Sequence, residues 1–364
     1  MKNEKIKIIK KGKKILFFTN YFFYPEEKGG AQISNLILLS SLKKLHNYEV
    51  TIVCVTENKE TKGSFLYSLE FLNGIKIIRI PKTNNFEYFR EKILFYIKEE
   101  QPKYIISEFF SHNDENILSF LDSFNEIKTF CFVRVVEPLF EFKINLLNTK
   151  LIANSDFTRD AIKETLNIDT EIIYPPLMFD CLLKKTNDFK NKKKITFINP
   201  IPEKGVDVAL GIAKLLPEEE FLFVLGGWKT GQKNHNSIKE ICVDIENIEV
   251  REYQYDLTQI FGETKLLIVP SQFLETFNRS VIEFGLMGIP ALVSDRGNLK
   301  YTVDQIFLVV EDYKNPMAYV DKIKKILSDE IMYEELSLKS KENSVKEKYT
   351  KKYNVHKLIE LLEK

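Results

Sequence analysis

Short apolar runs alternate with amphipathic stretches along most of the chain. In the first half, runs of strand length occur at Lys14–Thr19, Tyr48–Val55, Ile75–Ile80, Tyr104–Ser107, Thr129–Val136 and Leu151–Ala153. Between them, apolar residues recur at helical spacing at Ala31–Leu45, Phe86–Glu99, Asn116–Phe124 and Ser155–Thr165. This alternation is typical of parallel β-sheets with helices on both faces. We therefore predict an α/β fold that begins with a Rossmann-like domain.

The alternation is interrupted once and then starts again. Pro175 and Pro176 cannot continue a helix or a central strand, and a lysine-rich polar stretch follows them. Further strand candidates occur at Lys194–Asn199, Glu220–Leu225, Ile248–Arg251, Leu266–Val269, Ala291–Ser294 and Phe307–Val309. Helical patterns cover Asp207–Leu215, Arg279–Met287 and most of the chain after Asn315. The sequence thus predicts two Rossmann-like domains, residues 1–175 and 176–345, followed by a helical segment at 346–364.

The charge balance argues against nucleic acid as the main partner. The 53 Lys and Arg residues nearly equal the 52 Asp and Glu residues, so the molecule as a whole lacks a strongly basic field. Lysines concentrate at Lys2–Lys14 and Lys184–Lys194. Such runs are more often solvated faces or linkers than binding surfaces, although either could touch an anionic surface.

Cysteine usage and hydropathy suggest the compartment. The four cysteines show no CxxC spacing, which favours reduced thiols over disulfides or a zinc site. No run approaches the roughly 18 apolar residues that a membrane span requires. We expect a cytoplasmic protein, with peripheral contact at the inner face of the membrane left open.

Two glycine-containing loops are candidates for binding an anion. Gly29 and Gly30 end a polar loop just before a helix, where free amides favour a negative charge, although such a pair is more often a simple turn. In the second domain, Lys204 and Gly205 follow the first strand in the same way. The Lys204 ammonium could meet a diphosphate there, assisted by the amides of the next helix.

The strongest chemical signal is a pair of acids between Pro270 and Gly297. Glu275 closes a loop after a strand, and Glu283 lies eight residues later on the following helix. Both carboxylates can address one cleft, and a carboxylate suits a ligand rich in hydroxyl groups because it accepts paired hydrogen bonds. The apolar neighbours of Glu283 argue against an idle surface acid.

This segment resembles the E-x7-E signature of the glycosyltransferase family 4 group. Gly288-Ile289-Pro290 and Ser294-Asp295-Arg296-Gly297 match the usual continuation. Further matches are Gly29-Gly30-Ala31-Gln32, Ala153 to Thr158, Ile173 to Pro176, and Pro202-Glu203-Lys204-Gly205. They span most of the chain in the expected order. The resemblance implies a GT-B fold, with two Rossmann-like domains facing each other across a cleft and the C-terminal helix at 346–364 packing back on the N-terminal domain.

The resemblance also implies roles for individual residues. Glu283 would hold the donor ribose, Glu275 would contact the donor sugar, and Lys204 would neutralise the departing diphosphate. The remaining donor-binding candidates are Gly30, Asn199, Gly226, Arg251, Tyr253, Thr276, Phe277 and Asn278. Arg134 is a catalytic candidate that would line the cleft, and Glu137 would line the cleft as well.

A retaining hexosyltransferase reaction follows from the same resemblance. The donor would be a nucleotide diphosphate sugar, with UDP or GDP as the expected nucleotide, and the acceptor a glycan, a lipid-linked glycan or a protein. The departing phosphate would take the acceptor proton. We expect no cofactor and no metal, since no Asp-x-Asp pair occurs and Lys204 with helix amides can replace the charge of a cation.

Several positions depart from the family pattern. Asn199 stands where an arginine is common, Asn278 where a glycine is common, and Val135 follows Arg134 where an aspartate often does. These departures leave room for a non-catalytic GT-B partner subunit that binds an acceptor or stabilises an active transferase. A nucleotide-sugar epimerase of the same architecture is a further alternative, although it would not call for the acidic signature.

Overall fold

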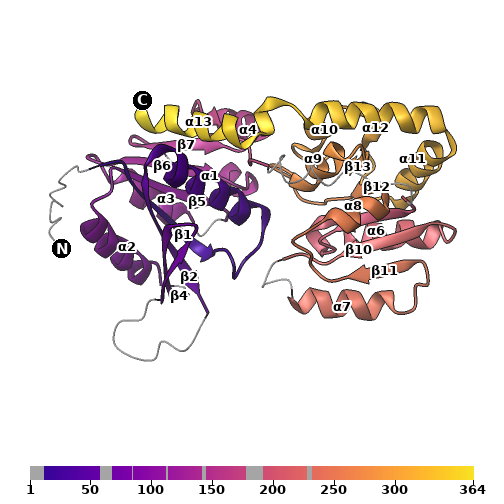
Figure 1. Ribbon diagram of the computed structural model, residues 1–364, viewed down its shortest axis with the longest axis horizontal. Coiled ribbons are helices and arrows are strands. Elements are labelled where there is room, and N and C mark those ends of the chain that lie inside the picture. The colour runs from indigo at the N-terminus through magenta and orange to yellow at the C-terminus, as the bar shows by residue number, and fades with distance from the viewer. Residues whose placement is uncertain are drawn as a thin grey trace. The chain divides into compact units, whose positions relative to one another are not determined.

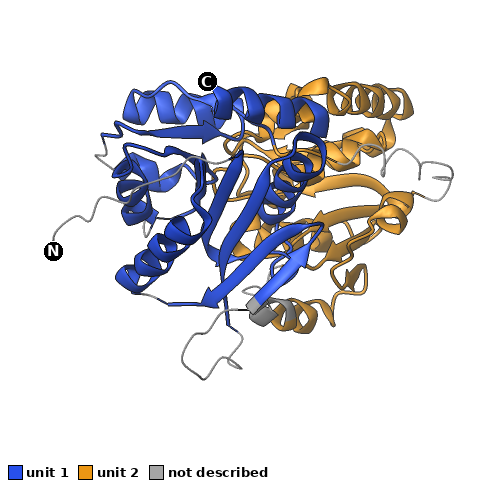
Figure 2. Cartoon of the chain, turned by 60° about the vertical axis from the view of Figure 1, so that its left-hand side comes forward, with its two compact units in different colours: residues 1–174, 351–364 blue, residues 175–350 orange. Residues whose placement is uncertain are grey.

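The computed structural model of the protein describes residues 12–57, 68–83, 85–111, 114–141, 145–177, 192–227 and 232–364, with residues 68 and 232–235 described by their backbone alone. The chain divides into two compact units (Figure 2). Unit 1 comprises residues 1–174 and 351–364, and unit 2 comprises residues 175–350. Most of the two lysine-rich runs lies outside the described residues.

Unit 1 is built on an eight-stranded sheet in the order β3-β4-β2-β1-β5-β6-β7-β8 (Figure 1). Among the strand pairs that the structure describes in this sheet, only β3–β4 is antiparallel. The strands are β1 (Lys14–Phe22), β2 (Glu49–Thr56), β3 (Ser68–Leu72), β4 (Ile75–Pro81), β5 (Tyr104–Phe109), β6 (Lys128–Val133), β7 (Thr149–Ala153) and β8 (Glu171–Ile172). The helices are α1 (Gly30–His46), α2 (Phe86–Glu100), α3 (Glu115–Asp122), α4 (Asp156–Leu166), α13 (Lys351–Glu363) and the 3-10 turn η2 (Glu137–Glu141).

Both faces of the unit 1 sheet are buried, because successive residues of a strand point to opposite sides. In β1, Ile15 and Phe17 join an apolar cluster with residues of α1 and α13. Leu16 and Phe18 join a second cluster with residues of α2, α3 and α4. The sheet is therefore a central layer covered by helices on both faces, which confirms the predicted α/β class.

The helix α13 belongs to unit 1 although unit 2 precedes it in the chain (Figure 2). Its inner face is a row of buried apolar residues, Val355, Leu358, Leu361 and Leu362. They join the apolar cluster that contains residues of α1. At the end of the helix, the Glu363 carboxylate accepts hydrogen bonds from Tyr48 Oη (3.0 Å) and Lys13 Nζ (2.6 Å).

Unit 2 is built on a six-stranded parallel sheet in the order β11-β10-β9-β12-β13-β14. The strands are β9 (Lys194–Ile198), β10 (Glu220–Val224), β11 (Ile248–Arg251), β12 (Thr264–Val269), β13 (Ala291–Ser294) and β14 (Val309–Val310). The helices are α6 (Val206–Leu215), α7 (Gln232–Cys242), α8 (Thr258–Glu263), α9 (Arg279–Leu286), α10 (Leu299–Val303), α11 (Pro316–Ser328) and α12 (Glu330–Ser344). The 3-10 turns are η3 (Pro202–Lys204), η5 (Ile306–Leu308) and η6 (Glu347–Tyr349). In the described parts of both units, no helix is long and apolar enough to cross a membrane.

The chain enters and leaves unit 2 along two adjacent segments. Leu177, just after the entry, donates its backbone N–H to the carbonyl of Tyr349 at 3.0 Å and forms a parallel bridge with Thr350. The ring of Phe277 packs against that of Tyr349, with centroids 5.9 Å apart. These contacts hold the two segments side by side on unit 2.

The main difference from the predicted elements lies at Phe307–Val309. The apolar run predicted a strand, but Ile306–Leu308 form η5 and only Val309–Val310 pair with β13. A run of three apolar residues can be buried in either conformation, so periodicity does not separate them. The helix α7 and the short elements β3, α8 and α10 are also not predicted.

We expect Leu358→Ala to destabilise unit 1 by about 2–5 kcal/mol, because truncating a fully buried leucine leaves a cavity. Leu338→Ala is the matched control, since Leu338 lies on α12 and is 59% exposed. It should change the free energy of unfolding by less than about 0.5 kcal/mol. Urea unfolding followed by circular dichroism measures both variants, and hydrogen exchange of unit 1 peptides assigns the transition. Equal effects would contradict the docking of α13.

Candidate active site

The strands of unit 2 are parallel, so their carboxyl ends share one edge of the sheet. At that edge the chain connections change direction between two neighbouring strands. From β9 the chain continues to β10 and β11 on one side, and from β12 to β13 and β14 on the other. In open α/β sheets, ligands bind in the crevice beyond such a switch point. Lys204 follows β9 and Glu275 follows β12, so the topology brings both residues to this point.

Lys204 and Glu275 are in direct contact there. Lys204 Nζ donates to Glu275 Oε1 at 2.5 Å, and the same oxygen accepts hydrogen bonds from Ser271 Oγ (2.7 Å) and Asn278 Nδ2 (3.1 Å). The side chains of Lys204 and Glu275 are 15% and 4% exposed. The other carboxylate oxygen, Oε2, accepts no hydrogen bond from the described residues. One oxygen of this buried acid is thus saturated, and the other retains its capacity to accept from a ligand.

The backbone around Glu275 fixes the position of its carboxylate. The Glu275 carbonyl accepts a hydrogen bond from the Asn298 N–H at 2.6 Å. Gly297 has a φ of 61°, and a Cβ there would lie 2.4 Å from the Glu275 carbonyl oxygen. Only glycine suits both this left-handed backbone and this close approach. The Gln272 N–H also donates to the Glu203 carbonyl at 2.9 Å, so the loops after β9, β12 and β13 support one another.

The helix α9 begins directly behind the buried acid. Asn278 is its N-cap, and its Oδ1 accepts a hydrogen bond from the Val281 N–H at 3.3 Å while its Nδ2 donates to Glu275. Asn278 has a φ of −119°, which does not require glycine. The structure therefore gives a physical reason for asparagine here, because its side chain joins the helix start to the acid. Thr276 and Phe277 form the link between them, and Thr276 is buried.

Glu283 lies on α9 and is held by a different cation. Arg279 Nη2 donates to Glu283 Oε1 at 3.1 Å, and Arg279 Nη1 donates to the Pro176 carbonyl at 2.8 Å. The side chains of Arg279 and Glu283 are 13% and 15% exposed. As in Glu275, Oε2 of Glu283 accepts no hydrogen bond from the part of the chain that the structure describes. The two acids thus share one arrangement, in which a cation binds Oε1 only.

Asn199 and Gly226 follow the neighbouring strands β9 and β10 and lie against each other. Asn199 has a φ of 60°, a left-handed conformation that asparagine tolerates better than most residues. A Cβ on Gly226 would lie 2.1 Å from Asn199 Oδ1 and 2.6 Å from Asn199 Cγ. The Asn199 side chain therefore occupies the space that any larger residue at position 226 would need. Their predicted role in donor binding stays a prediction.

Arg251 ends β11 and takes part in an ion-pair network. It donates to both oxygens of Glu263 (3.0 and 3.1 Å) and to Glu249. The hydrogen bond from Arg251 contributes most to lowering the pKa of Glu263 to about 2. Lys194 Nζ, at the start of β9, also binds Glu263 at 2.8 Å. The guanidinium is thus engaged within unit 2, and the donor-binding role of Arg251 and Tyr253 stays a prediction.

Unit 1 has a switch point of its own, between β1 and β5. Gly30 opens α1 after β1, is exposed, and is preceded by the N-cap residue Gly29. Gly29 makes no side-chain hydrogen bond to this helix start, and the first turn contains no acid. Free amides at a helix N-terminus favour an anion, which agrees with the role predicted for Gly30 without testing it.

Arg134, which follows β6, is buried beside an acid of unit 1. It donates to Asn35 Oδ1, and its Nε lies 3.5 Å from Glu108 Oε2, to which Asn35 Nδ2 also donates at 2.6 Å. The side chains of Arg134 and Glu108 are 4% and 0% exposed. Burial raises the pKa of Glu108 and lowers the pKa of Arg134, because loss of hydration penalises each charged form. Glu137 lies at the start of η2 and is partly exposed. That Arg134 and Glu137 line the cleft stays a prediction.

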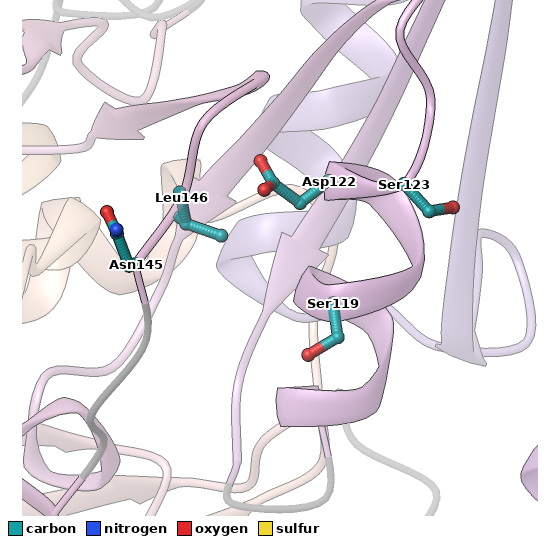
Figure 3. A pocket seen from close by; sticks show the side chains of 5 residues that line it. All are labelled: Ser119, Asp122, Ser123, Asn145 and Leu146. Carbon is teal, nitrogen blue, oxygen red and sulfur yellow. The ribbon is translucent and has the colours of Figure 1, made fainter.

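Unit 1 has a hollow of about 290 Å³ (Figure 3). It lies at the amino edge of the unit 1 sheet, opposite the carboxyl edge where Gly30 and Arg134 lie. Its lining residues are Ser119, Asp122, Ser123, Asn145 and Leu146. The end of α3, which carries Asp122, precedes the start of β6 and therefore lies at the amino edge of the sheet. The Asp122 carboxylate accepts hydrogen bonds from the backbone N–H groups of residues 147–149. This acid shapes a loop, and the hollow is separate from the carboxyl edge.

Two residues of the site are not predicted from the sequence. Ser271 donates to Glu275, and no spacing signals this contact because it depends on the turn of the loop between them. Arg279 binds Glu283, and here the spacing of four residues on a helix was an available signal.

Unit 2 is similar to a known protein family. Residues 180–343, which are most of unit 2, match the family model described as glycosyl transferases group 1. An uncharacterized 42.6 kDa protein in the cps region of Klebsiella pneumoniae is 24% identical over 340 residues, which cover 78% of this chain and 86% of that protein.

Solved structures of similar fold cover almost the whole chain. Sucrose-phosphate synthase from Thermosynechococcus elongatus has a TM-score of 0.76 at 15% identity, covering 96% of this chain and 98% of that one. Anabaena HepE in complex with UDP has a TM-score of 0.72 at 14% identity, with 96% and 99% covered. WaaG, a glycosyltransferase involved in lipopolysaccharide biosynthesis, has a TM-score of 0.67 at 15% identity, with 95% and 99% covered. The chain therefore has the GT-B fold, and its residues 180–343 match the model of the group 1 glycosyl transferases.

Proposed function

We propose that the protein is a retaining hexosyltransferase that moves a sugar from a nucleoside diphosphate sugar to an acceptor. The observation that supports this most directly is the contact of Lys204 with Glu275 at the switch point between β9 and β12. An ammonium group suits a diphosphate, and the Oε2 atoms of Glu275 and Glu283 suit sugar and ribose hydroxyls. A nucleotide sugar carries both kinds of group.

The nucleotide is proposed to be UDP or GDP. UDP is the first to test, because Anabaena HepE was solved in complex with UDP and with UDP-glucose. The proposed neighbours of the nucleotide are Asn199 and Gly226, which follow β9 and β10, and Arg251 and Tyr253, which end and follow β11.

In the proposed reaction, the bond between the sugar C1 and the diphosphate oxygen breaks and positive charge develops on the sugar ring. The acceptor oxygen attacks from the face that the diphosphate leaves, and the leaving phosphate oxygen takes the acceptor proton. Lys204 and the amides of Thr276 to Asn278 stabilise the negative charge that develops on the diphosphate, the task that a metal ion performs elsewhere. Glu275 holds the sugar hydroxyls during this step.

The acceptor is proposed to be a glycan, a lipid-linked glycan or a protein. WaaG acts in lipopolysaccharide biosynthesis, which makes a lipid-linked surface glycan the first acceptor class to test. Such an acceptor would place the reaction in the cytoplasm at the inner face of the membrane.

Measuring turnover distinguishes an active transferase from a non-catalytic partner subunit. The protein is incubated with UDP-glucose, UDP-galactose or GDP-mannose, and release of the nucleoside diphosphate is followed. Proton NMR of the earliest sugar product should show the α anomer, as in the donor. Tight nucleotide binding without release from any donor, with lipid-linked or glycan acceptors present, would favour the partner subunit. A β anomer would contradict retention.

We expect Lys204→Gln to weaken UDP binding by roughly 10- to 100-fold, because a charge-assisted hydrogen bond to the diphosphate is worth about 1.5–3 kcal/mol. Its affinity for uridine, which lacks phosphate, should not change. Lys265→Gln is the matched control, since Lys265 is also ion-paired in unit 2 and 22% exposed, but it binds Glu219 and lies at the amino end of β12. Isothermal titration calorimetry measures all three proteins. Equal losses for UDP and uridine in Lys204→Gln would contradict the phosphate role.

We expect Gly226→Ala to destabilise the protein by about 1–3 kcal/mol and to weaken UDP binding, because the new methyl group displaces the Asn199 side chain. Asn199→Gly in the same chain removes that side chain and should restore most of the stability, since glycine adopts the φ of 60° at position 199 without strain. Thermal and urea unfolding of the two single variants and the double variant give the coupling energy. Strictly additive effects would show that the two residues do not pack as described.

A further inference from the structure

Arg279 occupies a position that does not favour the helix it begins. It is the first residue of α9, where the positive end of the helix dipole opposes a cation. An arginine four residues before a glutamate is also the weaker order for such a pair on a helix. Local helix stability therefore does not account for this residue.

The contacts of Arg279 suggest another role. One guanidinium nitrogen binds the Pro176 carbonyl at 2.8 Å and another binds Glu283 Oε1 at 3.1 Å. Because a guanidinium is a planar fork with fixed angles between its donors, this bridge fixes the carboxylate relative to the carbonyl. Both side chains of the ion pair are mostly buried, so water competes weakly for these hydrogen bonds.

The carbonyl at the other end of the bridge belongs to a well-supported segment. Leu177, the next residue, is 1% exposed and donates its N–H to the Tyr349 carbonyl at 3.0 Å. Tyr349 is 2% exposed and packs against Phe277, two residues before Arg279. The segment at Pro176 is thus a fixed anchor rather than a loose loop.

We infer that Arg279 is a positioning residue for nucleotide recognition. It binds Oε1 of Glu283 from the anchor at Pro176 and thereby keeps Oε2 available for the hydroxyls of the ribose, without touching the ligand itself. The inference rests on the proposed function, in which Glu283 binds the ribose. It predicts that Arg279 controls the discrimination between a ribonucleotide and its deoxy analogue, while the diphosphate contacts of Lys204 do not depend on it.

The test compares the dissociation constants of UDP and 2′-deoxy-UDP by calorimetry. The wild type should bind UDP roughly tenfold or more tightly than the deoxy analogue, because the analogue lacks one hydrogen bond to a charged acceptor. In Arg279→Met this ratio should fall close to one, mainly through weaker UDP binding. Glu283→Gln provides the ratio expected when the ribose contact is lost directly. Arg279→Lys keeps the charge but lacks the planar guanidinium, so the ratio of the two dissociation constants should also fall close to one.

Arg296→Met is the matched control within unit 2. Arg296 donates from Nε to the Gln272 carbonyl at 3.0 Å and stacks near Tyr313, so it also anchors a loop through a carbonyl. Its loss should change the affinities for UDP and the deoxy analogue by the same factor and leave the ratio intact. If Arg279→Met does not fold, Arg279→Lys carries the comparison.

The outcomes separate the inference from the proposed function. A wild type that binds neither UDP nor GDP would overturn both. A wild type that binds UDP without preferring it to the deoxy analogue would overturn the ribose role of Glu283 and the inference with it. If both Arg279 variants prefer UDP to the deoxy analogue as strongly as the wild type does, while Glu283→Gln loses this preference, the role of Arg279 is overturned and the proposed function stands.

Discussion

The candidate site depends on how the strands of the unit 2 sheet are connected. From β9 the chain continues to one side of the sheet, and from β12 it continues to the other. Because the connections from these two central strands lead to opposite sides, the crevice beyond their carboxyl ends stays free of a crossing segment. The residues that follow the two strands must therefore meet, however far apart they lie in the chain. Lys204 and Glu275, 71 residues apart, are joined in this way.

The charge arrangement at this point suits a ligand that carries phosphate and hydroxyl groups. Without a ligand, the ammonium of Lys204 offsets the charge of the buried Glu275. An incoming diphosphate would compete for that ammonium, while Ser271 and Asn278 would continue to hold the carboxylate in place. Little reorganisation is then needed, which is the condition under which fixed charges and dipoles stabilise a transition state best. Glu283 is held in a similar manner by Arg279, with one oxygen bound by a cation.

Much of the fold could be predicted from the sequence, because long apolar runs and amphipathic periods reflect burial directly. The sequence places Lys204 and Glu275 after strands, because each of them follows an apolar run of strand length. The site was not predictable where a contact depends on distant packing. The bridge from Arg279 to Pro176 spans 103 residues and exists only because the entry segment lies beside η6. The burial of Arg134 depends on Glu108, whose place in an apolar strand run gives no sign of a partner on α1.

The switch point of unit 2 is proposed to bind a nucleoside diphosphate through Lys204, Glu275 and Glu283, and a crystal structure of the protein with UDP is the decisive test. We expect diphosphate density within hydrogen-bonding distance of Lys204 Nζ, with ribose hydroxyls at Glu283 Oε2 and Glu275 still bound by Ser271. UDP bound at another place on the chain, with Lys204 still paired to Glu275 alone, would contradict it.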